Sequence, residues 1–224
     1  AFKDNMQIFG APLALPPRLG FENFVKAEAA GNLGRAIVIS LGVMVSAEVL
    51  TLLVTFPAAY AIARIRTPLA GPVEGFFSLG FLVPAFAMLV PVLLLMAKLG
   101  VLYSPTSLVL FYPAWRLPLA LVVLASYLRT VPLELEESAE IDGASRLQII
   151  RHILFPLARP GVITVVIINA ITFWNEYLFA LILLSQKNRT MQVALAVLEG
   201  EHLVQYGVLA AGIIISILPV FIVF

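Results

Sequence analysis

The chain contains no cysteine and few charged residues. Without Cys in its 224 residues it has neither disulfide bonds nor thiolate metal sites. Only 12% of the residues are charged and 61% are hydrophobic, whereas soluble domains carry about 25% charged residues. A chain with so little polar surface is an integral membrane protein. The net charge of +1 gives no reason to expect nucleic acid, and His152 and His202 are too far apart in sequence to suggest a metal site.

A phosphate-binding loop is also missing. The pattern G-x-x-x-x-G-K-[ST] does not occur, because the chain has no Gly-Lys pair at all. Any coupling to ATP therefore needs a partner. No nucleophile, base and orienting group stand out as a catalytic set, so we expect a protein that is not an enzyme and binds no cofactor of its own.

Long apolar runs predict an all-α membrane protein with a bundle of five visible spans. A helix needs about 20 apolar residues to cross a bilayer. Pro84 and Pro91 predict kinks in the second span. Arg116 stands between Pro113 and Pro118, so either this charge lies at membrane depth or the third helix is broken there. The spans are expected at 35–64, 74–98, 104–129, 161–185 and 204–224.

Polar segments separate these spans. The composition of residues 1–34 predicts an irregular external segment, followed by a transmembrane domain over 35–224. Residues 186–203 are polar enough to predict a second, shorter loop outside the membrane. The chain starts with Ala1 and stops within an apolar run at Phe224, so we expect it to be the ordered part of a longer protein. Lys and Arg are spread almost evenly over the two sides, so the positive-inside rule does not orient it.

The most polar stretch is the loop 130–160. Basic residues follow its acidic start at Arg146, Arg151 and Arg159. A charge at the centre of a bilayer costs about 2.5–3.5 kcal/mol on insertion scales, so this block lies in water. Five of the chain's 13 acidic residues stand at its start: Glu134, Glu136, Glu137, Glu140 and Asp142.

The loop reads as helix, glycine turn, helix. Thr130 is the expected N-cap of the first helix, with Pro132 in its first turn. Gly143 takes the position of a left-handed residue that ends this helix, and Ser145 caps the second, which Pro156 stops. The apolar residues Leu147, Ile150, Ile153 and Leu154 follow helical spacing and are expected to pack back onto the protein. On these grounds alone, a docking element and a simple linking hairpin are equally good interpretations.

The loop resembles the EAA loop of ABC importer permeases. Glu137, Ser138 and Ala139 stand at the E-A-A, with Ser for the first Ala. Asp142, Gly143 and Ala144 match the D-G-A of that pattern, and the segment FPLARP at 155–160 matches its tail. The segment FWNEYLFAL at 173–181 resembles the carbohydrate-type permeases, and the first residues resemble the second maltose-like permease subunit. That family usually has six spans, so the resemblance places a missing span before Ala1.

The resemblance implies a multi-pass subunit of a bacterial or archaeal plasma membrane importer, moving a sugar by alternating access. It implies a second permease subunit, usually a different one, two ATPase subunits that bind ATP and Mg, an external substrate-binding protein and surrounding lipid. It also places the polar loop inside, with 1–34 and 186–203 outside. The residues expected to couple to the ATPase are Glu134, Glu136, Glu137, Ser138, Ala139, Glu140, Asp142, Gly143, Ala144 and Ser145.

Several polar or aromatic residues lie within the spans. Such groups usually face a bundle interior or a water-filled path and pair with one another. Arg116 is expected to pair with Glu48 or Glu176, or to meet an anionic group of the cargo. Packing, helix capping and subunit contacts are the alternatives to a substrate path. The candidates for that path are Glu48, Arg116, Asn169, Trp174, Asn175, Glu176 and Tyr177.

Two other functions remain open from the sequence. The same machinery could carry a polyol, a glycerophosphate-like compound or another anionic solute, since Arg116 is a cation at membrane depth. A protein of a different class, an ion-coupled secondary transporter, would use Glu48 and Glu176 as proton or sodium sites.

Overall fold

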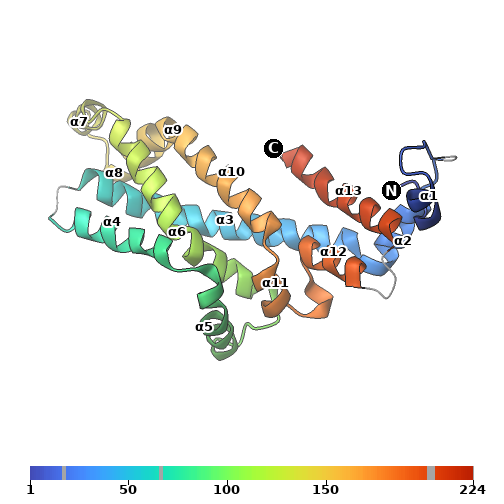
Figure 1. Ribbon diagram of the computed structural model, residues 1–224. Coiled ribbons are helices and arrows are strands. Elements are labelled where there is room, and N and C mark those ends of the chain that lie inside the picture. The colour runs from blue at the N-terminus through green and yellow to red at the C-terminus, as the bar shows by residue number, and fades with distance from the viewer. Residues whose placement is uncertain (17–18, 66–67, 201–204, 224) are drawn as a thin grey trace. The chain divides into compact units, whose positions relative to one another are not determined.

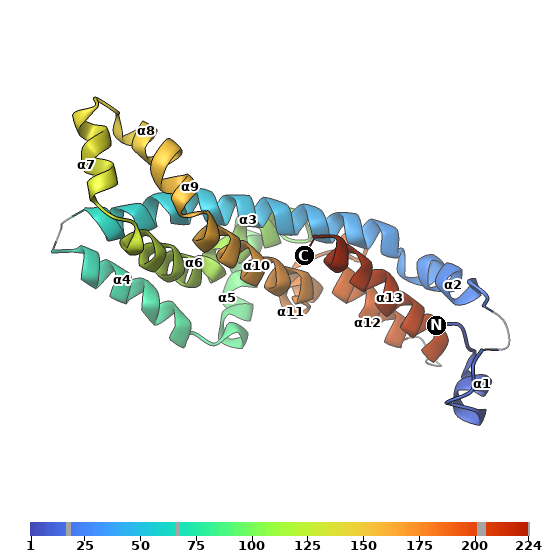
Figure 2. The ribbon, with the colours of Figure 1, turned by 90° about the horizontal axis from the view of Figure 1, so that it is seen from above.

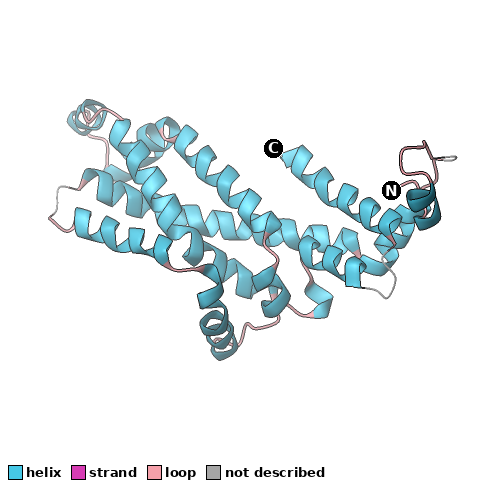
Figure 3. Ribbon diagram, in the orientation of Figure 1, coloured by secondary structure: helices cyan, strands magenta, loops and turns pink. Residues whose placement is uncertain are grey.

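The computed structural model describes residues 1–16, 19–65, 68–200 and 205–223. Over these ranges every regular element is a helix, loops connect the helices, and one isolated β-bridge joins Tyr103 and Leu184 (Figure 3). Two compact units form, and each is described by itself. The terminal unit comprises Ala1–Met44, Met96–Leu108 and Trp174–Phe224, and the central unit comprises Val45–Leu95 and Val109–Phe173.

The terminal unit is built around the last helix. Helix α13 (Tyr206–Val223) packs against α1 (Asn5–Gly10), α2 (Glu22–Gly31) and α12 (Met191–Gly200), which lie together in Figures 1 and 2. The expectation of an irregular segment over 1–34 is therefore wrong in part. The Asp4 side chain accepts the Gln7 amide at 2.8 Å and starts α1 with a capping box.

The central unit contains the longest helices. Its elements are α3 (Leu33–Arg64), α4 (Ala70–Ser78), η1 (Leu79–Leu82), α5 (Ala85–Lys98), α6 (Pro105–Thr130), α7 (Glu134–Ile141), α8 (Arg146–Ile149), η2 (Ile150–Leu154), α9 (Phe155–Leu157) and α10 (Arg159–Asn175). The starts of α3 and α6 and the ends of α5 and α10 belong to the terminal unit. One apolar core joins α3, α6 and α10 to the loop helices. Leu121, Leu124 and Leu128 of α6 are fully buried in it beside Leu154 of η2.

The candidate membrane spans follow the predicted apolar runs. Helices α3 and α6 are long and apolar enough to cross a bilayer, and they coincide with the first and third predicted spans. Two bent pairs, Ala70–Leu82 with Ala85–Lys98 and Arg146–Leu157 with Arg159–Asn175, raise the number to four if each is one span. The fifth predicted span corresponds to the shorter apolar helix α13.

Proline positions explain only part of the bending. The second predicted span breaks by 100° between Leu82 and Ala85, where Pro84 stands, so a kink there is confirmed. Pro91 lies inside α5, and both Pro113 and Pro118 lie inside an uninterrupted α6. The alternative of a broken third helix is therefore wrong.

The fourth predicted span is not one helix to Ser185. Helix α10 ends at Asn175, and a separate helix, α11 (Leu178–Leu183), starts three residues later. The following stretch, expected as a loop over 186–203, contains η3 (Gln186–Asn188) and α12. Residues 201–203 of that loop, with His202, lie outside the described residues.

Candidate functional site

The polar loop forms a helix, a glycine turn and a second helix, as predicted. Helix α7 ends at Ile141, and Gly143 adopts a φ of +82°. The Ala144 amide donates to the Ala139 carbonyl at 2.9 Å, which closes the turn. Nothing lies within 4 Å of a Cβ placed on Gly143, so the backbone conformation alone, and not space, favours glycine there.

The caps differ in part from the sequence interpretation. Ser145 does cap α8: its hydroxyl accepts the Gln148 amide, and the Gln148 side chain accepts the Ser145 amide at 2.7 Å. Thr130, however, is the last residue of α6, and its hydroxyl donates to the Tyr127 carbonyl instead of capping α7. Pro132 precedes α7, and Pro156 lies within α9. The Thr130 and Pro132 predictions are wrong because α6 runs on to Thr130 and α7 begins only at Glu134. The second loop helix does end next to Pro156: its path stops at Leu157, before a bend of 69° into α10.

The surface of the loop combines exposed acids with exposed apolar side chains. Ile141 is 86% exposed and Leu147 is 73% exposed, on either side of the glycine turn. Leu147 therefore does not pack back onto the protein; Ile149, the buried residue of α8, does so. A cavity of about 330 Å³ lies behind the turn, lined by Asp142, Gly143, Ala144, Gln148, Ile149, His152 and Ile153. The exposed acidic or small side chains are Glu134, Glu137, Ser138, Glu140, Asp142 and Ser145, while Ala139 and Ala144 are half-buried.

Glu136 is the exception among the acids of the loop because it is buried. Its carboxylate forms an ion pair of 2.6 Å with the Nε of Arg64, the last residue of α3. The Arg64 Nη2 also donates to the Val131 carbonyl at 2.7 Å. Burial raises the pKa of the Glu136 carboxyl, although the Arg64 guanidinium acts in the opposite direction. The sequence interpretation missed Arg64, because a basic residue at a helix C-terminus is commonplace and signals no partner.

A second polar group lies among the long helices of the central unit. The Arg116 Nε of α6 donates to the Oδ1 of Asn169 in α10 at 3.0 Å. Glu48 of α3 is 7% exposed, and Arg116 and the Asn169 amide are the polar groups that act on its carboxylate. Neither Glu48 oxygen nor the Asn169 Nδ2 has a hydrogen-bond partner among the described residues. The hydrogen bond of Arg116 goes to Asn169, so the pairing of Arg116 with Glu48 stays a prediction.

The remaining candidates surround the break between α10 and α11, in the terminal unit. The Glu176 carboxylate accepts the Phe179 amide at 2.7 Å and the Ala180 amide at 3.0 Å, so it caps α11. Trp174 is 5% exposed, whereas Tyr177 is 40% exposed. Tyr177 lines a cavity of about 510 Å³ together with Gln192, Leu195, Ala196, Glu199, Leu209 and Ile213.

No group of three or more His, Cys, Asp or Glu side chains that could hold a metal ion occurs among the described residues. Those residues offer instead an exposed loop surface and a polar group within the helices. These features suit mechanical coupling and the passage of a polar solute, and they supply no catalytic set.

Comparisons with known proteins agree with these features. Residues 51–224 match the family model described as "Binding-protein-dependent transport system inner membrane component". The diacetylchitobiose uptake system permease protein NgcG of Streptomyces coelicolor is 30% identical, covering 100% of this chain and 75% of that protein. The trehalose transport system permease protein SugB of Mycobacterium tuberculosis is 30% identical, over 92% of this chain and 76% of that protein.

A solved structure shares the fold. A bacterial ABC transporter involved in the import of the acidic polysaccharide alginate matches with a TM-score of 0.79 at 23% identity, covering 93% of this chain and 79% of that one. Family membership overturns the alternative of an ion-coupled secondary transporter. The chain is a transport subunit and not an enzyme, and ATP binding belongs to the ATPases of such systems. This chain belongs to the binding-protein-dependent transport system inner membrane components, the multi-pass permease subunits of ABC importers.

Proposed function

We propose that this permease moves a neutral sugar or a related polyhydroxylated solute. The observation that carries the proposal is the group of Glu48, Arg116 and Asn169, which offers hydrogen-bonding groups of both kinds on α3, α6 and α10. The names of its relatives support the class of cargo, since they include permeases for diacetylchitobiose, for trehalose and for melibiose, raffinose and stachyose.

The charges of this group favour a neutral cargo over an anionic one. Arg116 and Glu48 have opposite charges and act on each other. The Arg116 guanidinium is also bonded to Asn169 and lies 5.8 Å from the centre of the Trp115 ring. An anionic solute would have to compete with Glu48 for this arginine, whereas sugar hydroxyls both donate and accept hydrogen bonds.

The other candidates take different parts in the proposal. Tyr177 offers an exposed aromatic face to a sugar ring at its cavity. Trp174, Asn175 and Glu176 shape the break between α10 and α11, because Trp174 is buried and Glu176 caps the second helix.

The polar loop is proposed to dock on an ATPase subunit. The exposed Ile141 and Leu147 on either side of the Gly143 turn, with the acidic residues around them, suit a cleft that is apolar at its base and basic at its rim. On this proposal the loop 130–160 faces the cytoplasm, and 1–34 and 186–203 face a substrate-binding protein outside. A second permease subunit completes the pore, and two ATPase subunits drive it.

Uptake into proteoliposomes tests the cargo class. The complete transporter is supplied with its binding protein and with radiolabelled trehalose, melibiose or an alginate oligosaccharide. We expect uptake of a neutral sugar, and a loss of about 10-fold or more in Arg116→Ala and Asn169→Leu, because each leaves a buried polar group without its partner. Lys98→Ala, which removes an exposed charge at the end of α5, is the matched control.

Two outcomes would contradict this. Uptake confined to the alginate oligosaccharide would establish the anionic alternative instead. Unchanged uptake in Arg116→Ala, Arg116→Lys and Asn169→Leu, with normal folding, would remove this group from the substrate path.

A further inference from the structure

Arg64 occupies an unusual position where α3 ends beside the polar loop. It is the last residue of α3, and its guanidinium contacts two different segments: the Glu136 carboxylate of α7 at 2.6 Å and the Val131 carbonyl after α6 at 2.7 Å. Both side chains of the ion pair are buried, with exposed fractions of 7% for Arg64 and 11% for Glu136. One planar cation thus joins the end of α3, the segment that leaves α6, and the first turn of α7.

The pair of Arg64 and Glu136 lies at the junction of α3 with the loop helices. A cavity of about 220 Å³ has walls from α3, α7 and α8, so the guanidinium lies where these three helices meet. Tyr60, one turn before Arg64 on α3, lines the same cavity. The other lining residues are Ile65, Leu133, Glu136, Glu137, Glu140 and Arg146.

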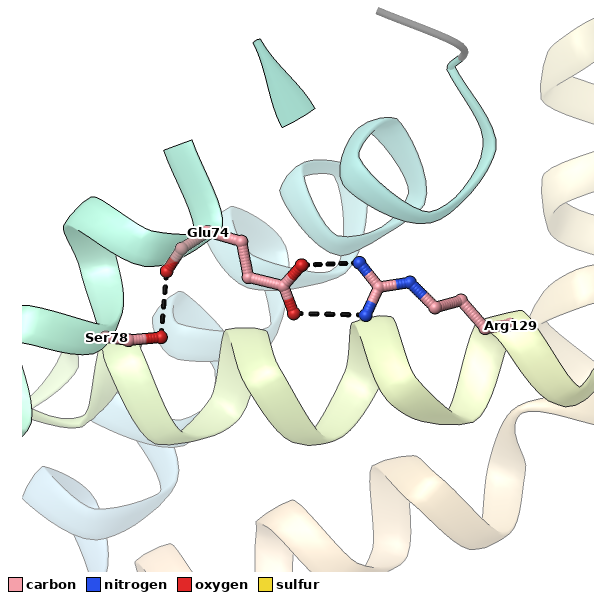
Figure 4. Close-up of polar contacts among 3 residues, drawn as sticks. All are labelled: Glu74, Ser78 and Arg129. Carbon is pink, nitrogen blue, oxygen red and sulfur yellow. Dashed lines mark hydrogen bonds and ion pairs between the residues drawn. The ribbon is translucent and has the colours of Figure 1, made fainter. Parts of the chain in front are cut away.

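A second ion pair in the central unit has a different environment. Arg129 of α6 and Glu74 of α4 form two parallel bonds of 3.0 Å and 2.5 Å (Figure 4). Their side chains are 43% and 22% exposed, so solvent screens them. They join α4 to the end of α6 and involve no residue of the loop helices α7 and α8, which makes this pair a matched comparison for Arg64 and Glu136.

Buried ion pairs are poor stabilisers, because removing two charges from water offsets their attraction. The raised pKa of Glu136 agrees, since burial outweighs the arginine there. What this pair supplies is a fixed position. The Arg64 Nη2 holds the guanidinium by its hydrogen bond to the Val131 carbonyl, and the Glu136 carboxylate lies 2.6 Å from the Nε as a buried ion pair, with no hydrogen bond between those two atoms.

We propose that Arg64 and Glu136 form a rigid connection through which a movement of the loop helix α7 is passed to α3 and α6. This inference rests on the proposed docking of the loop. Arg64 and Glu136 are positioning residues that touch neither ATP nor cargo. Along α3, Glu48 lies 16 residues before Arg64, or about 24 Å at 1.5 Å per residue. The connection therefore ends on the same two helices that carry Glu48 and Arg116.

The test measures the distance between α7 and α3 in the complete transporter. Because the chain has no cysteine, Val45→Cys and Leu135→Cys give two unique spin-label sites, both exposed on helices of the central unit. Their separation is measured by pulsed electron resonance with ADP and then with ATP and vanadate. In the wild type we expect one narrow distance that is the same in both states, since α3 and α7 move together.

The key variant is the double substitution Arg64→Met with Glu136→Met. It replaces the pair by apolar side chains of similar length, which preserves folding where the pair is only structural. We expect this variant to retain its ATPase subunits and to hydrolyse ATP. The distance between the two spin labels should now change on addition of ATP, and the uptake per ATP hydrolysed should fall about 10-fold. Arg64→Lys, which keeps the charge and loses the fork, should show the same change in milder form.

The control is Arg129→Met with Glu74→Met, which should leave the distance and the uptake per ATP unchanged. The proposal would be overturned if the double variant of Arg64 and Glu136 kept both the spin-label distance and the uptake per ATP of the wild type. It would also be overturned if the control variant lost as much uptake per ATP as the double variant. A wild-type permease that fails to retain ATPase subunits at all would instead refute the docking of the loop. A distance that already changes in the wild type would show that docking occurs without a rigid connection.

Discussion

Single residues in the polar loop act through backbone conformation and burial. The left-handed conformation of Gly143 was expected from sequence, because a glycine that follows a short polar helix is typical of a left-handed helix end. The buried pair of Glu136 and Arg64 was not expected, since the sequence placed Glu136 with the exposed acids. Burial of one acid among five depends on which side of α7 meets α3, and no residue pattern in a helix of eight residues decides that.

Substitutions of Gly143 should be destabilising only through the left-handed backbone conformation that they must adopt. Its φ is +82° and a Cβ there meets no atom within 4 Å, so Gly143→Asn should have a small effect, Gly143→Ala should cost about 1–2 kcal/mol, and Gly143→Val more. Retention of ATPase subunits on purification should fall in the same order. Gly100→Val supplies the control, since Gly100 has a φ of +72° and open space, but lies outside the loop. Equal retention in Gly143→Val and Gly100→Val would contradict docking of the loop.

Glu136 should make the stability of the permease depend on pH. Burial raises the pKa of its carboxyl above the ordinary 4.5, so the folded state binds its proton more tightly than the unfolded state does. As pH rises from 4.5 through the raised pKa, wild type should therefore lose thermal stability relative to Glu136→Gln, with no further change above it. The charged groups around the carboxyl are Arg64, Glu140 and Arg146, with the Tyr60 hydroxyl nearby. A difference in Tm that is constant with pH would show that Glu136 titrates normally.

At the scale of helices, the sequence predicted the long apolar elements and missed the breaks. Helices α3 and α6 lie where continuous apolar runs placed them, and Pro84 marks the bend of the second run. The end of α10 at Asn175 was missed because an apolar run, Leu178–Leu184, resumes three residues after it. Glu176 starts the new helix by accepting two amides, and its charge was interpreted as a candidate for the substrate path as well as for a cap.

The two roles of Glu176 can be separated by experiment. Glu176→Ala removes both acceptors from the first turn of α11 and should lower the free energy of unfolding by about 0.5–2 kcal/mol, whereas Glu176→Gln keeps one acceptor oxygen and should cost less. Thermal unfolding in detergent measures this effect. The KM for uptake should be unchanged in both variants if the residue only caps α11. A large increase in KM with unchanged stability would instead indicate that Glu176 contacts the substrate.

For the whole molecule, the distribution of Lys and Arg does not determine which way the chain is oriented in the membrane. Basic residues divide almost evenly between the two sides, so the docking proposal alone places the loop in the cytoplasm and residues 1–34 outside. The absence of cysteine makes this placement measurable without background labelling. Leu13 in the first segment is 99% exposed and Leu147 in the loop is 73% exposed, and neither substitution disturbs a packed core.

We expect a membrane-impermeant maleimide to label Leu13→Cys in intact spheroplasts and Leu147→Cys only in inside-out vesicles. The reason is that a charged reagent cannot cross the apolar spans between the two positions. Labelling of both variants in detergent controls for accessibility, and ATPase subunits are stripped from the vesicles beforehand so that docking does not shield Leu147. Labelling of both positions from the same side would contradict the proposed topology. Labelling in the reverse pattern would place the loop outside the cell, where no ATPase subunit can bind it. It would therefore contradict both the docking of the loop and the proposed connection through Arg64 and Glu136.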